Sequence, residues 1–157
     1  MLNNGNGDFT VGWEMDDERS SVGGITLADF DGDGDLDALL ANGYRETGSF
    51  PSLLLWNDGK GNFTDSGQIL NETLGAELAI GDLDDDGSPD VFVANMDMPD
   101  EIWLNRDGKL VDSGLRLGTK SNLSGRPSLG DLDGDGDLDV VVGRFKGGPQ
   151  IWFNASE

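Results

Sequence analysis

Short apolar runs alternate with acidic segments along the whole chain. The apolar runs "ITLA", "LAIG" and "PSLG" each lead into an acidic segment, and "ALLAN", "VFVAN" and "VVVG" follow these segments. A third set of runs, "LLWN", "IWLN" and "IWFN", ends in Asn, and Gly-containing turns follow the first two of them. The runs are short, bounded by turn residues and without helical periodicity, which predicts strands. The pattern therefore predicts an all-β chain.

These runs repeat with a nearly constant spacing. The acidic segments begin at Asp29, Asp82 and Asp131, which are 53 and 49 residues apart. A period of this length indicates propeller blades or solenoid coils, and four short strands per repeat favour β-propeller blades. We expect one domain over residues 1–157, with three four-stranded repeats at about 4–57, 58–105 and 106–154.

The first residues of the chain copy the turn that follows a third strand. "LNNGNGDFT" at 2–10 matches "WNDGKGNFT" at 56–64, so Asn3 corresponds to Asn57, Asn105 and Asn154. The chain would thus begin with a fourth strand and leave its last blade without one. Three blades cannot close a ring, because known rings have about 4–8 blades. We predict a homodimer that forms a six-bladed ring by exchanging N-terminal strands; the alternative is an arbitrary cut through a larger protein.

The acidic segments share the pattern D-x-D-x-D-G-x-x-D. Oxygen ligands at alternate positions suit Ca²⁺, with Mg²⁺ as second choice. Positions 1, 3 and 5 would supply carboxylates, position 7 a backbone carbonyl and position 9 the closing carboxylate. We expect one calcium ion per segment, three per chain; the alternative is solvated acidic turns without an ion. The expected ligands are Asp29, Asp31, Asp33, Asp35, Asp37, Asp82, Asp84, Asp86, Ser88, Asp90, Asp131, Asp133, Asp135, Asp137 and Asp139.

These segments differ from an EF-hand. An EF-hand needs Glu at position 12, between two helices, whereas position 12 here is Leu40, Val93 and Val142. The segments are therefore expected at hairpin tips. The middle one departs most from the pattern, with Asp85, Ser88 and Pro89, and is expected to bind more weakly.

Five stretches of the sequence share a family pattern: the acidic segments "LADFDGDGDLD", "AIGDLDDDGSPD" and "SLGDLDGDGDLDVVVG" and the hairpins "IWLN…DGKL" and "LNNGNGDFT". In these stretches the sequence resembles the FG-GAP/VCBS repeat family. This family comprises calcium-loop β-propellers such as the integrin α-subunit head. The resemblance implies structural calcium at the named Asp positions and a role in extracellular adhesion or in protein or glycan binding. The chain departs from the family in size, since family propellers usually have about seven blades.

Composition narrows the functional classes. The net charge is −21, from 31 acidic and 10 basic residues, so a nucleic-acid partner is not expected. The chain has no His and no Cys, which excludes the usual zinc sites and His-based acid–base chemistry. No apolar run is long enough for membrane insertion. Paired carboxylates could serve glycoside hydrolysis, but the dense acidic groups all belong to the repeated segments, so we expect no enzyme.

Other residues give weaker signals. Trp56, Trp103 and Trp152 are expected in the core between blades, with a sugar platform as the alternative. Tyr44 and Arg45, in a longer connection, are candidate ligand contacts, with a plain long loop as the alternative. Glycosylation sequons favour an extracellular or cell-surface location; they begin at Asn62, Asn71, Asn122 and Asn154.

Three functions remain open at this point. The first is an extracellular calcium-stabilised module that binds a protein or glycan in adhesion. The second is a structural, oligomerising half-propeller, natural or engineered, without a ligand. The third is a calcium-dependent lectin.

Overall fold

The structure is a computed structural model, and it describes residues 11–15, 22–42, 44–45, 48–49, 51–70, 77–96, 98–119, 124–145 and 147–154. Every regular element in these residues is a β-strand, so the all-β prediction is confirmed. The same residues contain no helix with the length and hydrophobicity needed to cross a membrane.

The strands form three antiparallel sheets and one small ribbon. Sheet 1 has the order β1-β2-β5-β6 and sheet 2 the order β7-β8-β9-β10. Sheet 3 has the order β11-β12-β13. The ribbon pairs β3 with β4 and lies in the long connection between β2 and β5. The bounds are β1 Val22–Ala28, β2 Asp37–Asn42, β3 Tyr44–Arg45, β4 Gly48–Ser49, β5 Leu53–Asn57, β6 Phe63–Ile69, β7 Glu77–Gly81, β8 Asp90–Ala94, β9 Asp100–Arg106, β10 Lys109–Leu117, β11 Ser124–Gly130, β12 Asp139–Arg144 and β13 Gln150–Trp152.

Sheets 1 and 2 therefore have the four strands predicted for each repeat, whereas sheet 3 has three. Within the described residues the last repeat forms three strands, which agrees with the prediction that it lacks its outer strand. The missing strand is the outermost one, as the repeat pattern predicted for the end of the chain. The proposed closure into a dimeric ring stays a prediction.

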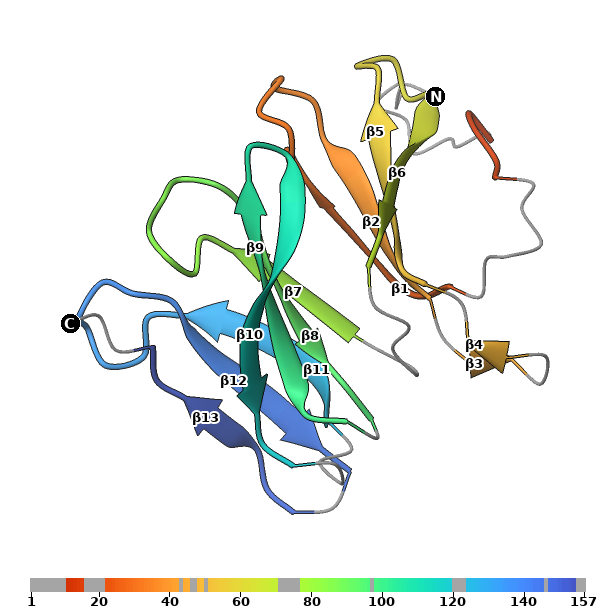
Figure 1. Cartoon of the computed structure of the whole chain (residues 1–157). Helices are drawn as coiled ribbons and strands as arrows, with labels where there is room; N and C mark the ends of the chain where they lie inside the picture. The colour runs from red at the N-terminus through yellow and green to blue at the C-terminus, as the bar shows by residue number, and fades with distance from the viewer. Residues whose placement is uncertain are drawn as a thin grey trace, which may run out of the picture.

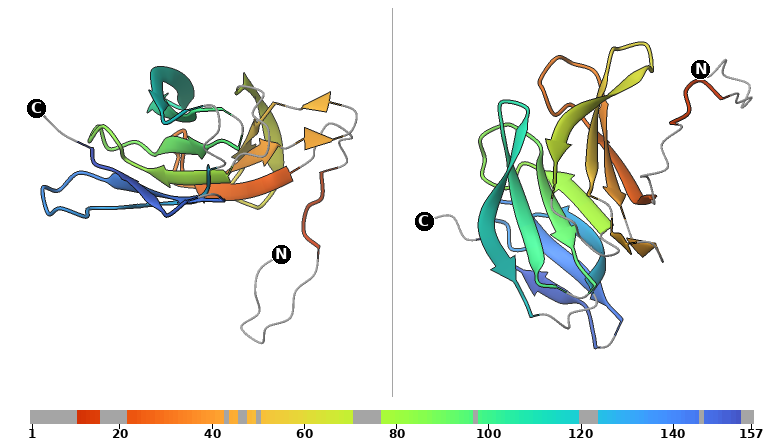
Figure 2. Two further views of the ribbon diagram at one scale, coloured as in Figure 1. Left: turned by 90° about the horizontal axis from the view of Figure 1, so that it is seen from below. Right: turned by 45° about the vertical axis from the view of Figure 1, so that its right-hand side comes forward.

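The sheets follow one another face to face (Figures 1 and 2). One apolar cluster lies between sheets 1 and 2, where Phe30, Leu39 and Leu54 meet Val91 and Val93. A second cluster lies between sheets 2 and 3, where Leu83, Phe92 and Ala94 meet Val140 and Val142. Successive side chains of a strand point to opposite faces. The uninterrupted apolar run of β8, buried at all of its residues, is therefore explained by burial on both faces.

The tryptophans of the third strands belong to these contacts. Trp56 and Trp103 pack against the first cluster, and Trp152 packs against the second. Their predicted place between repeats is confirmed.

Residues 11–15 lie against the outer face of sheet 1. Met15 and Phe63 pack on a buried group formed by Ala38, Leu40, Leu53 and Leu55. The ring of Trp13 lies 5.3 Å from that of Phe63, centroid to centroid. These five residues adopt no strand, although the match to residues 63–69 predicts one.

Candidate metal centre

Each acidic segment connects the first and second strands of its sheet. We name residues 29–37 loop 1, residues 82–90 loop 2 and residues 131–139 loop 3. Because all three sheets have the same strand order, the loops emerge along one rim of the molecule (Figure 1). The predicted hairpin positions are confirmed.

In every loop, three carboxylates converge. One oxygen from each member lies within 4.8 Å of the others, in the groups Asp29–Asp31–Asp33, Asp82–Asp84–Asp86 and Asp131–Asp133–Asp139. Oxygens that surround Ca²⁺ at about 2.3–2.6 Å lie at most about 5 Å from one another. The donor set is oxygen only and negatively charged, as a hard divalent cation requires. These acidic groups could hold a metal ion.

The backbone of each loop is folded around the first aspartate. Asp29 accepts hydrogen bonds from the N–H groups of Gly32 at 2.8 Å and Gly34 at 3.0 Å. Asp82 accepts from Asp86 and Gly87, at 3.1 and 2.8 Å. In loops 1 and 2 these bonds fix the turn, and the carboxylates of positions 3 and 5 converge on the first; in loop 3 the position 5 residue, Asp135, is outside the converging group.

The turn requires a left-handed backbone at two positions. Position 6 has φ of 96° at Gly34 and 104° at Gly136, and position 4 has φ of 78° at Gly32. Glycine adopts such angles without steric cost. In loop 2, position 4 is Asp85 with φ of 58°. Aspartate tolerates this region better than most residues do, so loop 2 keeps the shape with a local strain that the other two loops lack.

The aspartate at position 9 has a structural role that sequence reasoning did not identify. Asp37 is fully buried, and its two oxygens accept the N–H groups of Phe30 and Asn57, at 3.0 and 2.9 Å. Asp90 accepts hydrogen bonds from the backbone N–H groups of Leu83 and Asn105, both at 2.8 Å. Asp139 accepts hydrogen bonds from the backbone N–H groups of Leu132 at 2.8 Å and Asn154 at 2.9 Å. In each repeat this carboxylate ties the start of the loop to the end of the third strand.

Only in loop 3 does the position 9 carboxylate also join the converging group, through Asp139. Asp37 and Asp90 are outside the groups formed by the first three aspartates of their loops. Burial raises the pKa of Asp90, and its two backbone hydrogen bonds oppose this shift. The ligand role of position 9 stays a prediction.

Position 7 differs between the loops. The carboxylate of Asp35 is directed at Gly59, where a β-carbon would clash with it at 2.3 Å. In loop 3, the Oδ2 atom of Asp137 is buried and has no hydrogen-bond partner in the described part of the chain. A buried carboxylate oxygen without a donor is costly, and a cation in the loop would compensate for it. Ser88 donates its N–H to Asp86 at 2.9 Å.

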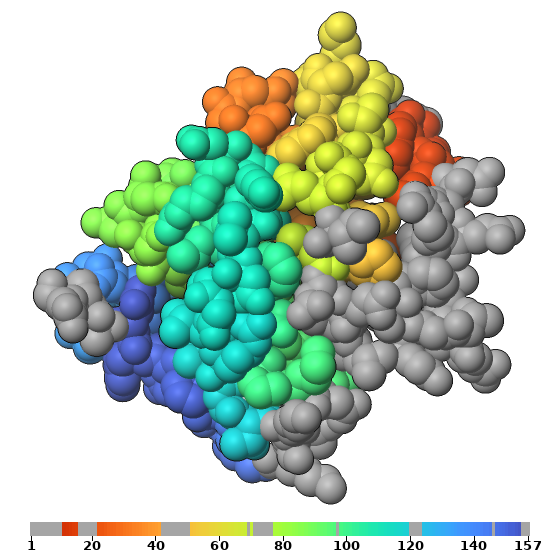
Figure 3. All heavy atoms as spheres, in the orientation of Figure 1, coloured from red at the N-terminus to blue at the C-terminus, as the bar shows by residue number. Residues whose placement is uncertain are grey.

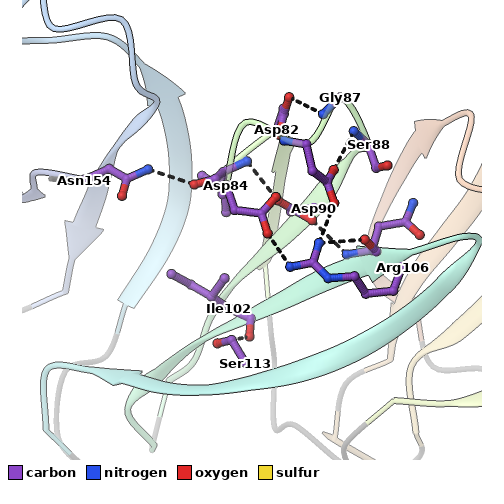
Figure 4. Close-up of polar contacts among 12 residues, drawn as sticks. Asp82, Asp84, Gly87, Ser88, Asp90, Ile102, Arg106, Ser113 and Asn154 are labelled. Atoms are coloured by element: carbon purple, nitrogen blue, oxygen red, sulfur yellow. Dashed lines mark hydrogen bonds and ion pairs between the residues drawn. The ribbon is translucent and has the colours of Figure 1, made fainter. Parts of the chain in front are cut away.

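An arginine approaches loop 2 from the following hairpin. The Arg106 guanidinium forms ion pairs with Asp84 and Asp86 (Figure 4). The N–H of Ser88 and the charge of Arg106 lower the pKa of Asp86. The corresponding residue of the first repeat is Asp58, so a comparison of the repeats could have found this cation. Loop 2 therefore carries an internal positive charge where a metal ion would act.

Crowding is visible in the other loops. Loss of hydration raises the pKa of Asp31, and the charges of Asp37, Asp33 and Asp29 raise it further. The pKa of Asp133 is raised by the same kinds of effect, loss of hydration and neighbouring negative charge. The carboxylates repel one another, which a bound cation would relieve.

Asparagines at the ends of the third strands connect neighbouring repeats. The side-chain amide of Asn105 donates to the carbonyl of Phe30 in loop 1 at 2.9 Å, and Asn154 donates to Leu83 in loop 2 at 2.8 Å. Figure 4 shows Asn154 reaching across to the strand-and-loop region of sheet 2. The shapes of loops 1 and 2 are thus each coupled to the sheet that follows.

The remaining candidates are less informative. Tyr44 and Arg45 pair with β4, but their side chains are outside the described structure, and so are Asn71 and Asn122. Asn62 is exposed at the turn before β6, and its amide donates to Asp58 at 2.8 Å. The amide of Asn154 is engaged between sheets 2 and 3.

A search of curated proteins finds no match to the chain. A comparison with protein-family models matches residues 82–142 to the FG-GAP-like repeat. The matched segment begins at the first aspartate of loop 2 and extends through loop 3 into β12. The chain therefore contains an FG-GAP-like repeat, which confirms its resemblance to the FG-GAP/VCBS repeat family.

Proposed function

We propose that the chain is a calcium-binding β-propeller module whose sheets are blades and whose acidic loops each hold one structural calcium ion. The observation that carries this proposal is the recurrence, in all three loops, of three carboxylate oxygens within 4.8 Å of one another. Positions 1, 3 and 5 supply carboxylates to the ion, and positions 7 and 9 complete its ligands.

The ion acts through the packing of the blades. Calcium would shape the loop and so fix the carbonyls of Phe30 and Leu83, which accept the amides of Asn105 and Asn154. Occupied loops thereby stabilise the contact between each blade and the next. This is a scaffold role, and we assign no catalytic step to the acidic residues.

The setting that suits such a module is extracellular, where calcium sites with dissociation constants of about 10⁻⁴–10⁻³ M are occupied. There the scaffold would present its surface to a protein or glycan in adhesion. The family resemblance supports this assignment; the geometry of the loops supports only the calcium sites.

Calorimetric titration of the metal-free protein with Ca²⁺ tests the proposal. We expect binding at loops 1 and 3 and weaker binding at loop 2, where Arg106 opposes the ion. One site at a hundredfold excess over its dissociation constant stabilises by about 2.7 kcal/mol. At about 2–4 °C per kcal/mol for a chain of this size, chelation should lower the melting temperature by several degrees.

The matched control is the double variant Asp31→Asn/Asp33→Asn, which removes two ligands from loop 1 alone. It should lose one binding event and retain the binding at loop 3. Absence of calcium binding, together with equal melting temperatures in chelator and in millimolar calcium, would contradict the proposal.

A further inference from the structure

A pocket lies between sheets 2 and 3, at the ends of the strands that point away from the acidic loops. It has a volume of about 310 Å³ and is placed where the start of β7 meets the start of β11 and the end of β12 (Figure 1). The residues that line it are Glu77, Gly125, Arg126, Gly143, Arg144 and Phe145. Pockets for small ligands have volumes of about 300–1,000 Å³, so this one suits a group of the size of a single sugar residue.

The pocket is built from the inner strands of two neighbouring sheets. β7 and β11 are the first strands of sheets 2 and 3. Figure 3 shows the surfaces of β6 and β10, which are the last strands of sheets 1 and 2 and thus belong to the other edge of these sheets. The pocket is therefore independent of the outer strand that sheet 3 lacks.

Arg126 is held in a strained backbone conformation. It lies in β11 with φ of 50°, at a shift in register between Gly125 and Ser128. The register of sheet 1 shifts at the same place, and the equivalent residue there, five positions before the loop, is Gly24. A bulge re-aims a side chain, and strained residues gather at functional sites. Glycine would serve the fold better at position 126, so the arginine is kept at a cost to stability.

The guanidinium of Arg126 is exposed, and it forms no ion pair or hydrogen bond with any residue in the part of the chain that the structure describes. Glu77 is close, but its carboxylate accepts the backbone N–H of Arg126 instead. The chain has 31 acidic residues for 10 basic ones, so acidic partners are plentiful. The side chain of Arg126 is thus available to an anion from outside the chain.

Arg144 brings a second guanidinium to the pocket from the end of β12. It is half-buried and lies opposite Ser124 in the strand pairing. Burial raises the pKa of Asp100, whereas its hydrogen bonds and the charge of Arg144 oppose that rise. The oxygens of Asp100 already accept the N–H of Asn95 and the hydroxyl of Ser124. Asp100 thus anchors Arg144, which lines the pocket together with Arg126.

The rest of the wall combines a polar acceptor with an apolar surface. The carboxylate of Glu77 offers about four lone-pair sites, so it can accept hydroxyl groups besides the N–H of Arg126. Phe145 is exposed and contributes a flat apolar ring. A β-carbon at Gly143 would lie 3.0 Å from the carbonyl oxygen of Gly125. The strands approach closely here, and no side chain of these two residues fills the space between the arginines and the ring.

We propose that this pocket binds a carboxylated sugar residue, a uronic acid, of an extracellular glycan. Arg126 and Arg144 donate to the sugar carboxylate, Glu77 accepts from the ring hydroxyls, and Phe145 packs on the apolar face of the ring. The planar guanidinium matches a carboxylate with two parallel hydrogen bonds. An acidic peptide would satisfy the arginines but would offer Glu77 no ring of hydroxyl groups. The inference rests on the ligand-binding role proposed above and names its ligand class.

The negative charge of the chain does not prevent an anion from binding at this place. β7 separates Glu77 from loop 2 with five residues, which span about 17 Å at about 3.4 Å per residue. The screening length is about 8 Å at physiological ionic strength, so repulsion from the loops is largely screened at the pocket. Binding of the sugar should therefore change little when calcium is removed.

Titration of the isotope-labelled protein with sodium glucuronate, followed by NMR, tests the proposal. The backbone N–H signals of Arg126 and Phe145 should shift and saturate at millimolar ligand, and methyl glucoside, a neutral sugar, should shift them far less. Arg126→Gly should abolish the response and leave the melting temperature equal or higher, since glycine adopts the left-handed backbone without strain. The control Lys60→Gln, which removes an equal charge at an exposed turn, should keep the response.

Phe145→Ala separates a sugar site from a site for any carboxylate. It should weaken the binding of glucuronate and leave the weaker binding of acetate unchanged. Equal affinities for acetate and glucuronate would show that the pocket takes carboxylates in general, peptide termini included, and would overturn the sugar assignment. The absence of a saturable response to glucuronate would overturn the site itself. Calcium binding that persists in that case would show that this inference fails while the calcium-binding module stands.

Discussion

At the scale of single residues, the acidic side chains divide into two kinds. Those at positions 1, 3 and 5 converge in loops 1 and 2, and in loop 3 Asp131 and Asp133 converge with Asp139 instead of Asp135. Those at position 9 are buried and satisfied by two backbone N–H groups each, as Asp37 is. The second kind stabilises the hairpin without a metal ion, so not every aspartate of the repeated pattern contributes to the protein in the same way.

Asp100 carries a pH dependence that is separate from the loops. It is 1% exposed and accepts hydrogen bonds from the N–H of Asn95 and the hydroxyl of Ser124. Burial raises the pKa of Asp100 above its ordinary value. The folded state therefore prefers the protonated form, and its stability declines as the pH rises from about 4, the ordinary carboxyl value, through the raised pKa.

Asp100→Asn should remove this dependence. The neutral amide can accept from Asn95 and donate to Ser124, so the variant should be at least as stable as the unmodified protein at pH 7. The difference should vanish near pH 3, where both forms are neutral. Urea unfolding at the two pH values, in chelator, measures it.

Asp112→Asn is the matched control with the opposite sign. The Arg116 guanidinium lowers the pKa of Asp112 to about 2, so this carboxylate stabilises the fold above its unfolded pKa. That stability is lost as the pH falls toward about 2. A destabilised Asp100→Asn protein at pH 7 would show that the burial cost is not what governs this site.

At the scale of elements, the hairpin with an acidic tip is the repeating unit, and much of it could be predicted from the sequence. The strands before and after each loop were predictable because apolar runs end at glycine, asparagine and aspartate. The β3–β4 ribbon was not, since its residues "YR" and "GS" form no apolar pattern. The Asn105–Phe30 bond was also beyond prediction, because its partners are 75 residues apart and only the packing of the sheets brings them together.

Loop 2 shows the same limit for the site. The departures at Asp85, Ser88 and Pro89 suggested weaker binding, but the ion pairs of Arg106 with Asp84 and Asp86 depend on how the β9–β10 hairpin curls toward the loop. The loop residues were enough to predict weaker calcium binding at loop 2. The main physical cause of that weakening, the charge of Arg106, lies on β9 outside the loop.

Arg106→Gln should therefore strengthen calcium binding at loop 2. Removing the positive charge that is paired with Asp84 and Asp86 frees these carboxylates for the ion. Because exposed ion pairs contribute little, the calcium affinity should rise by roughly a few-fold. Calorimetry on the Asp31→Asn/Asp33→Asn background isolates this change more clearly. Arg116→Gln, which removes an equal charge far from the loops, should leave the affinity unchanged; an equal gain in both variants would point to net charge alone.

At the scale of the whole molecule, the net charge of −21 is concentrated along one rim. The three loops hold 15 of the 31 acidic residues, five in each. Without cations this rim opposes compaction, because like charges at short range repel and are screened only by salt. Calcium and ordinary salt should thus partly replace one another in holding the protein folded.

Thermal melting at low and high sodium chloride checks this expectation. In chelator, raising the salt from 10 to 300 mM should raise the melting temperature, since about 300 mM salt shortens the screening length to below 8 Å. In millimolar calcium the same change should have a smaller effect. An equal salt response in both conditions would mean that the loops do not govern the electrostatic part of the stability.

The asparagine contacts give the row of sheets a direction. Asn105 reaches back to loop 1 and Asn154 reaches back to loop 2, so the ordering of a loop benefits the sheet made after it on the ribosome and not the one made before. Folding would then proceed from the N-terminal sheet onward. Each ordered loop would offer a backbone carbonyl to which the asparagine of the next sheet can bind.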